Sequence, residues 1–192
     1  FISSISTDQI DVAIDNVLKG EYKIRSRTVL QLKTENNLFG TTNFALNEVA
    51  IVKKDTSSMI RIDAFIDNEF LNSYWADGLV ISTPTGSTGY SLSCGGPIIL
   101  PGTENIIIAP IAPHNLNVRP IIINEKNSIR LKVEDRDQLA LVSLDSRSRA
   151  FDSSLELIIK KADFKINLIE PKDNSFISTI RNKLMWGSDK RN

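Results

Sequence analysis

Apolar positions near the start of the chain recur with the period of a helix. They are Ile10, Ala13, Ile14, Val17 and Leu18. This spacing puts them on one helical face and predicts a helical arm within residues 1–20. Thr7 is the predicted N-cap, and Gly20 is predicted to end the helix.

From Tyr22 onward the helical period gives way to short apolar or alternating segments. In residues 58–66, Ile60, Ile62 and Ala64 alternate with polar residues, which is typical of a strand with one buried face. Asp67-Asn68 then predicts a hairpin turn. Strands are predicted at 28–32, 46–52, 58–66, 70–75, 79–81, 105–109, 120–123, 128–133, 139–143, 155–159 and 164–169. Many short strands separated by turns indicate a mainly β (α+β) fold, built as a sandwich of two mainly antiparallel sheets.

Near the end of the chain the period of a helix returns. Ser175 is a candidate cap, Phe176, Ile177 and Ile180 share one face, and Gly187 is predicted to end the helix. A second helical arm is therefore expected within 174–187. The polar stretch 145–154 is predicted to be a loop within one domain.

The composition of the chain limits the kinds of partner that it could bind. The 192 residues carry 23 basic and 23 acidic side chains, so no overall positive field would recruit nucleic acid or an anionic membrane. No apolar stretch approaches the ~20 residues of a membrane span. The single Cys94 rules out an internal disulfide and favours a reducing, cytoplasmic location. We interpret this thiol as a small buried filler rather than as a reactive group.

Residues 77–93 contain the most informative pattern, in which an apolar strand is followed by a turn rich in hydroxyls and glycines. Pro84 stops strand pairing, and Gly86 and Gly89 let a ligand approach the backbone closely. Ser87 or Thr88 could cap a short helix whose N–H groups would attract a phosphate or ribose oxygen. The pattern indicates a nucleotide-binding loop, and an ordinary surface loop is the alternative.

The sequence TPTGSTGYSLS at 83–93, preceded by ADG and followed by GGP, resembles the signature of the NAD kinase family, which usually reads TPTGSTAYSLS. Three further segments resemble family motifs in the same order. They are Ala45–Glu48 (ALNE), Pro110–Leu116 (PIAPHNL) with Arg119-Pro120, and Leu184–Gly187 (LMWG). The resemblance therefore extends along nearly the whole chain.

The resemblance also implies what the chain does not contain. Such families carry a Gly-Gly-Asp-Gly-Thr motif in an N-terminal α/β domain, and no such string occurs here. We therefore expect residues 1–192 to be the C-terminal, NAD-binding and oligomerisation domain of an NAD kinase. The catalytic base is expected in the N-terminal domain, so no catalytic residue is assigned to this chain.

Asn47 and Glu48 are candidate ligand-binding residues at the start of a strand. An amide can pair with the edge of a purine, and a carboxylate can accept hydrogen bonds from ribose hydroxyls. The resemblance assigns these two roles to the pair. Without it, a turn Asn beside a solvated Glu is the simpler interpretation.

Asp77 lies just before the signature strand. The resemblance implies that it binds the nicotinamide-side ribose of NAD in a neighbouring subunit, within a homodimer or homotetramer. An Asp-Gly turn is the structural alternative.

Within the loop, Thr85 and Thr88 are expected to contact adenine and its phosphate. Tyr90 offers a flat ring or a phenol, and Ser93 would lie on the same side one helical turn later. Gly89 replaces the usual Ala of the family, so one methyl group is absent from the expected NAD-binding wall.

Ala112 matches a position that lines the nicotinamide pocket in the family. His114, the sole histidine, is a weaker candidate, and a structural hydrogen-bonding role is favoured for it.

Asp145 is also a weaker candidate, because Ser146 follows it where the family usually has Gly. Arg147 and Arg149 could meet a phosphate, although a solvated loop is the simpler account.

One Cys and one His cannot build a zinc, haem or iron–sulfur site, so no protein-held metal is predicted. Mg²⁺ would be held mainly by the phosphates of the donor. The resemblance implies transfer of a γ-phosphoryl group from ATP or polyphosphate to the 2′-hydroxyl of the NAD adenosine ribose. A related lipid or sugar kinase and a non-catalytic nucleotide-binding module remain alternatives.

Overall fold

The computed structural model describes residues 5, 7–54, 58–135, 139–172 and 175–185. By its internal contacts the chain divides into two compact units. One comprises residues 28–166, and the other combines residues 1–27 with 167–192. We describe each unit by itself.

The unit formed by the two ends of the chain contains the predicted helical arms and a two-stranded sheet of β1 and β14. Its elements are η1 (Thr7–Gln9), α1 (Ile10–Leu18), β1 (Tyr22–Arg27), β14 (Ile166–Pro171) and α3 (Phe176–Lys183). The guanidinium of Arg27 forms an ion pair with Glu170, which joins the two strands.

The predicted helix ends are partly confirmed. Gly20 has φ +72° directly after α1, and Ser175 is the N-cap residue of α3. The cap predicted at Thr7 is wrong, because Thr7 begins the 3-10 turn η1 and Gln9 precedes α1 without a side-chain cap bond. The predicted end at Gly187 lies outside the described residues.

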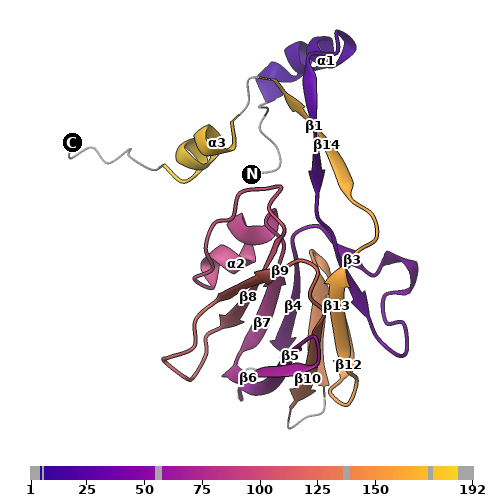
Figure 1. The fold of residues 1–192 in the computed structure, drawn as a ribbon, viewed down its shortest axis with the longest axis vertical. Helices are drawn as coiled ribbons and strands as arrows, with labels where there is room; N and C mark the ends of the chain where they lie inside the picture. The colour runs from indigo at the N-terminus through magenta and orange to yellow at the C-terminus, as the bar shows by residue number, and fades with distance from the viewer. Residues whose placement is uncertain (1–4, 6, 55–57, 136–138, 173–174, 186–192) are drawn as a thin grey trace, which may run out of the picture. The chain divides into compact units, whose positions relative to one another are not determined.

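Residues 28–166 form a sandwich of two six-stranded sheets, as predicted (Figure 1). The first sheet has the order β3-β2-β13-β10-β5-β6 and the second the order β12-β11-β4-β7-β8-β9. Every neighbouring pair within the two sheets is antiparallel. The first sheet comprises β2 (Leu30–Lys33), β3 (Phe44–Ala45), β5 (Ile60–Ile66), β6 (Glu69–Ala76), β10 (Ile129–Glu134) and β13 (Leu157–Lys161). The second comprises β4 (Glu48–Lys53), β7 (Gly78–Ser82), β8 (Asn105–Ile111), β9 (Ile121–Asn124), β11 (Leu139–Leu144) and β12 (Arg147–Asp152).

The main core lies between the two sheets. Ile60 and Ile62 of the first sheet belong to the same buried cluster as Val49 and Ile51 of the second. Alternation along these strands directs every second side chain into this cluster, because the side-chain period of a strand is two. The apolar positions that predicted these strands are thus the positions whose side chains are buried.

Strand β7 is buried along its whole length, because both of its faces are covered. Leu79 and Ile81 point into the main core, whereas Val80 belongs to a second cluster that includes Ile99. Cys94 packs against this second cluster and is half-buried, and burial raises the pKa of its thiol. The chain after β7, with η3 (Gly86–Thr88) and α2 (Tyr90–Ser93), therefore returns across the outer face of the second sheet.

The prediction of a loop over 145–154 is wrong. Residues 147–152 form the edge strand β12, which pairs with β11 from Leu144↔Arg147 to Leu139↔Asp152. Only Phe151 of this strand is buried, so its sequence is polar although its backbone is extended. By contrast, the predicted Asp67-Asn68 turn is confirmed, with φ +49° and +72° as a tight hairpin turn requires.

In the described part of the chain, no helix is both long enough and apolar enough to span a membrane.

Candidate functional site

The signature loop is fastened to the segment that contains Asn47. The backbone N–H of Thr83 donates to the carbonyl of Asn47 at 2.9 Å. The Thr83 hydroxyl donates to the carbonyl of Leu46 at 2.7 Å and accepts from the N–H of Gly86 at 3.1 Å. The end of β7 and the beginning of β4 are thus held together, and Glu48 pairs with Ser82 in the sheet.

Gly86 is required by close packing. A Cβ atom at this position would lie 2.2 Å from the Asn47 carbonyl oxygen, a separation at which something must shift. On the other side of the loop, the Ser87 hydroxyl donates to the Pro84 carbonyl at 2.7 Å and accepts from the N–H of Ile99 at 3.0 Å. The loop is therefore held from both sides.

The helix cap predicted at Ser87 or Thr88 is wrong. Gly89 is the N-cap residue of α2, and no side chain caps that helix. Ser87 is fully buried and bonds within the loop, and the Thr88 hydroxyl donates to the Thr85 carbonyl at 3.5 Å. Both hydroxyls therefore bond to backbone carbonyls within the loop.

Glu48 brings an acidic group against the loop. Its Oε2 atom is buried without a hydrogen-bond partner among the described residues. A Cβ atom on Gly89 would lie 3.4 Å from that oxygen. Burial, and secondly the negative charge of Asp145, raise the pKa of Glu48 to about 7. An unpaired buried oxygen with a perturbed pKa is typical of a binding site.

Asp145 is the third residue of this arrangement, after Asn47 and Glu48. It occupies the turn between β11 and β12 with φ +52°. Its carboxylate accepts hydrogen bonds from the backbone N–H groups of Leu46, Asn47 and Glu48 at 2.9, 2.7 and 3.2 Å. The structure thus joins Asn47, Glu48, Gly89 and Asp145 in one cluster at the Ser82 end of β7.

Asp77 lies at the opposite end of β7. Its carboxylate forms an ion pair with the Lys53 ammonium at 2.7 Å. The N–H of Asp77 donates to the Ile111 carbonyl at 2.9 Å, which brings Asp77 close to the exposed Ala112, whose φ is +44°. The N–H of His114 donates to a carbonyl of β6 at 2.8 Å, while its side chain is exposed. Asp77, Ala112 and His114 are therefore grouped away from Asn47 and Glu48.

Tyr90 and Ser93 are both exposed on the short helix α2. Burial of part of the ring raises the pKa of the Tyr90 phenol, and negative charge on Cys94 and Asp77 raises it further. The last contribution connects the helix electrostatically with the Asp77 end of β7. Thr85, which lies between the end of β7 and Gly86, is half-buried.

Arg147 has a structural role that the sequence did not reveal. Its guanidinium donates to the Thr42 carbonyl at 2.6 Å and also to the Phe44 carbonyl. Arg149 lies over the ring of Phe39, at 5.9 Å from its centroid. Arg147 thus anchors the β11–β12 hairpin to the strand β3 region.

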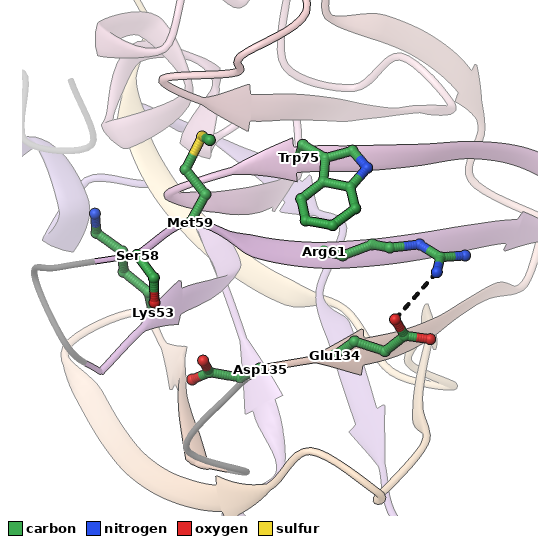
Figure 2. A pocket seen from close by; sticks show the side chains of 7 residues that line it. All are labelled: Lys53, Ser58, Met59, Arg61, Trp75, Glu134 and Asp135. Carbon is green, nitrogen blue, oxygen red and sulfur yellow. Dashed lines mark hydrogen bonds and ion pairs between the residues drawn. The ribbon is translucent and has the colours of Figure 1, made fainter.

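A cavity of about 600 Å³ lies beside β5 and β6 (Figure 2). Its lining comprises Lys53, Ser58, Met59, Arg61, Trp75, Glu134 and Asp135. Arg61 and Glu134 are paired on the neighbouring strands β5 and β10 and form an ion pair at 3.0 Å. Sequence reasoning missed this cavity because its residues come from separate strands and carry no shared motif. Lys53 connects it to Asp77.

The described residues contain no group of three His, Cys, Asp or Glu side chains that could hold a metal ion.

Fold and site together define a β-sandwich domain with a glycine- and hydroxyl-rich loop packed against an Asn-Glu strand start. Comparison with known proteins agrees with this class. Residues 46–170 match the family model of the ATP-NAD kinase C-terminal domain. The chain is 52% identical over its whole length to an NAD kinase of Cytophaga hutchinsonii and 44% identical to one of Bacteroides fragilis, and in each case it covers 66% of the relative.

Solved structures show the same fold. The yeast NADH kinase in complex with NADH aligns over 100% of this chain and 57% of its own, with a TM-score of 0.88 and 28% identity. An NAD kinase from Archaeoglobus fulgidus in complex with ATP aligns over 92% of this chain and 67% of its own, with a TM-score of 0.78 and 24% identity. The chain belongs to the NAD kinase family, as the sequence signature indicated. It spans just under two thirds of the length of the curated relatives, at 66%.

Proposed function

We propose that this chain is the dinucleotide-binding part of an NAD kinase, which transfers the γ-phosphoryl group of ATP to the 2′-hydroxyl of the adenosine ribose of NAD. Such transfer depends on positioning and charge neutralisation rather than on a covalent intermediate with the protein. The curated relatives are named NAD kinases, and the yeast structure contains NADH. In this proposal the chain binds and orients the acceptor, and the reacting groups come from an N-terminal domain.

The observation that carries the proposal is the buried Oε2 of Glu48 beside Gly89. A buried carboxylate oxygen without a donor is costly, and the hydroxyls of a ribose would supply the missing donors. Asn47 lies next to it and offers an amide to the purine. Thr85, Thr88, Tyr90 and Ser93 come from the loop and helix that follow β7.

Asp77 enters the proposal as a contact made by a second copy of the chain, as the sequence resemblance implies. Ala112 is proposed to line the nicotinamide pocket, and His114 remains a weaker candidate. The expected assembly is a homodimer or a homotetramer.

The remaining assignments also belong to the proposal. Mg²⁺ would accompany the donor phosphates, which are expected to supply most of its protein-independent ligands. The donor is ATP or polyphosphate, and the location is cytoplasmic. The chain alone is expected to bind NAD weakly and to form no NADP.

The test is NADP formation by the complete gene product that contains these residues, compared between wild type, Asn47→Ala and Glu48→Gln. We expect both variants to raise the KM for NAD by about tenfold, since each removes a polar contact. NADP formation with an unchanged KM in both variants would refute the assigned site. No NADP formation by the wild-type protein, with phosphorylation of a lipid or sugar instead, would favour a related kinase.

A further inference from the structure

We propose that Asp145 is a positioning residue, which holds Asn47 and Glu48 in the geometry that receives the dinucleotide and does not itself contact the ligand. The inference rests on the proposed function, because it concerns the same site.

The first support is the hydrogen bonding of the Asp145 carboxylate. Its Oδ2 accepts from the N–H of Leu46, and its Oδ1 accepts from the N–H groups of Asn47 and Glu48. The N–H of Asp145 in turn donates to the Glu48 carbonyl at 3.0 Å. Three backbone donors occupy most of the accepting capacity of the carboxylate, which leaves it poorly placed to bind a ligand hydroxyl.

The second support is the position of these donors in the sheet. Pairing between β4 and β11 ends at Val49↔Leu144, so the three N–H groups before Val49 have no partner on β11. Buried or half-buried backbone N–H groups need an acceptor. The Asp145 side chain supplies it where the ladder stops, and so fixes the start of β4.

The turn itself is built to present this side chain. Asp145 takes the left-handed conformation, which Asp tolerates better than most residues. Ser146 is not among the residues with positive φ, so the turn does not require the Gly that the family usually has there. The bonds from Arg147 to the Thr42 and Phe44 carbonyls hold the hairpin in place.

The geometry at residues 46–48 is transmitted directly to the signature loop. The carbonyl of Asn47 accepts from Thr83 and packs against Gly86, while Oε2 of Glu48 lies beside Gly89. A shift of residues 46–48 would therefore move both the Asn47-Glu48 segment and the signature loop that packs against it.

Asp145 also supplies charge to the site. Its negative charge raises the pKa of Glu48, in addition to the larger effect of burial. From the other elements beside Glu48, β7 contributes the neutral Ser82 opposite it, and the loop contributes Gly89. Neutralising Asp145 should thus lower the pH at which Glu48 ionises.

The experiment compares Asp145→Asn and Asp145→Ala with wild type in the complete gene product, using amide hydrogen exchange without ligand and calorimetric titration with NAD over a range of pH. Asp67→Asn is the matched control, because Asp67 also lies in a hairpin turn with positive φ and accepts a backbone N–H, from Ser128 at 2.8 Å. Asn at position 145 can still accept two of the three bonds, so this variant is expected to fold.

We expect the amides of Leu46, Asn47 and Glu48 to lose protection in both Asp145 variants before any NAD is added. NAD affinity should fall by about tenfold in Asp145→Asn and further in Asp145→Ala, with the midpoint of its pH dependence moved to lower pH. Asp67→Asn should change neither. Retained protection with lost affinity would overturn the inference, since it would make Asp145 a direct ligand contact, and so would wild-type affinity in both variants. Failure of the wild-type protein to bind NAD would instead refute the proposed function.

Discussion

At the scale of single residues, Glu48 carries the clearest sign of a binding role. Its carboxylate is half-buried, one oxygen has no hydrogen-bond partner among the described residues, and its pKa is raised to about 7. Such a group destabilises the fold when ionised, and a ligand that donates hydrogen bonds to it would offset that cost. Loss of the Glu48 charge should therefore increase the free energy of unfolding and weaken the binding of NAD.

The first prediction concerns the stability of Glu48→Gln. Glu48 holds its proton up to about pH 7 in the folded chain but only to about 4.5 when unconstrained, so its contribution makes stability fall as pH rises between these values. Glu48→Gln should be more stable than wild type by about 1–3 kcal/mol near pH 8 and nearly equal near pH 4, below the unfolded pKa. Urea unfolding at both pH values measures this. An equal difference at the two would contradict the raised pKa.

The second prediction concerns NAD binding by the wild-type protein. Ribose hydroxyls would donate to the ionised form of Glu48, so affinity should rise as the pH increases through about 7. Glu48→Gln should bind more weakly and lose this pH dependence. Calorimetric titration on either side of the midpoint measures both effects, and a wild-type affinity that does not change with pH would argue against the contact.

The third prediction separates the two glycines of the loop. Gly86→Ala would place a methyl group 2.2 Å from the Asn47 carbonyl oxygen, whereas Gly89→Ala would place one 3.3 Å from the Gly86 carbonyl oxygen. We expect Gly86→Ala to lower the free energy of unfolding by about 1–3 kcal/mol and to impair NAD binding. Gly89→Ala restores the usual residue of the family. It should change the free energy of unfolding and the NAD affinity by much less. Equal effects of the two substitutions would show that the packing at Gly86 is not decisive.

At the scale of elements, the hydrophobic pattern predicted most of the sandwich. The alternation in residues 58–66 corresponds to β5, and the apolar run 79–81 corresponds to β7, buried on both faces. Strand β12 could not be predicted, because an edge strand with one buried side chain has the composition of a loop. The role of Asp145 was also hidden, since its three donors lie about a hundred residues away in the sequence.

The fourth prediction concerns how the two sheets are fastened at one edge. Glu125, directly after β9, is buried and accepts from the Thr28 hydroxyl and the Lys161 ammonium, each at 2.7 Å. These bonds outweigh the opposing effect of burial and lower the pKa of Glu125. Glu125→Ala should lower the free energy of unfolding by about 1–3 kcal/mol, because it removes the hydrogen bonds to the Thr28 hydroxyl and to the partly exposed Lys161 ammonium. Exposed Glu134→Ala is the control and should cost much less, and a similar cost for both would exclude this role of Glu125.

At the scale of the whole molecule, the expected NAD-binding residues form two groups at opposite ends of β7. Asn47 and Glu48 lie at one end with the signature loop, and Asp77 and Ala112 lie at the other. The sequence resemblance identified both groups but could not show their separation, which depends on the length and direction of a single strand. That a second copy contributes Asp77 to the site is implied by the sequence resemblance.

The central claim is that the signature loop and the Asn47-Glu48 strand start form the binding site of a pyridine dinucleotide. Calorimetric titration of the complete gene product with NAD, in the wild type and in Asn47→Ala, tests it most directly. The account predicts saturable binding with one NAD per chain, weakened about tenfold or more by the substitution. Equal affinity in the two proteins, with the variant folded as wild type, would contradict it.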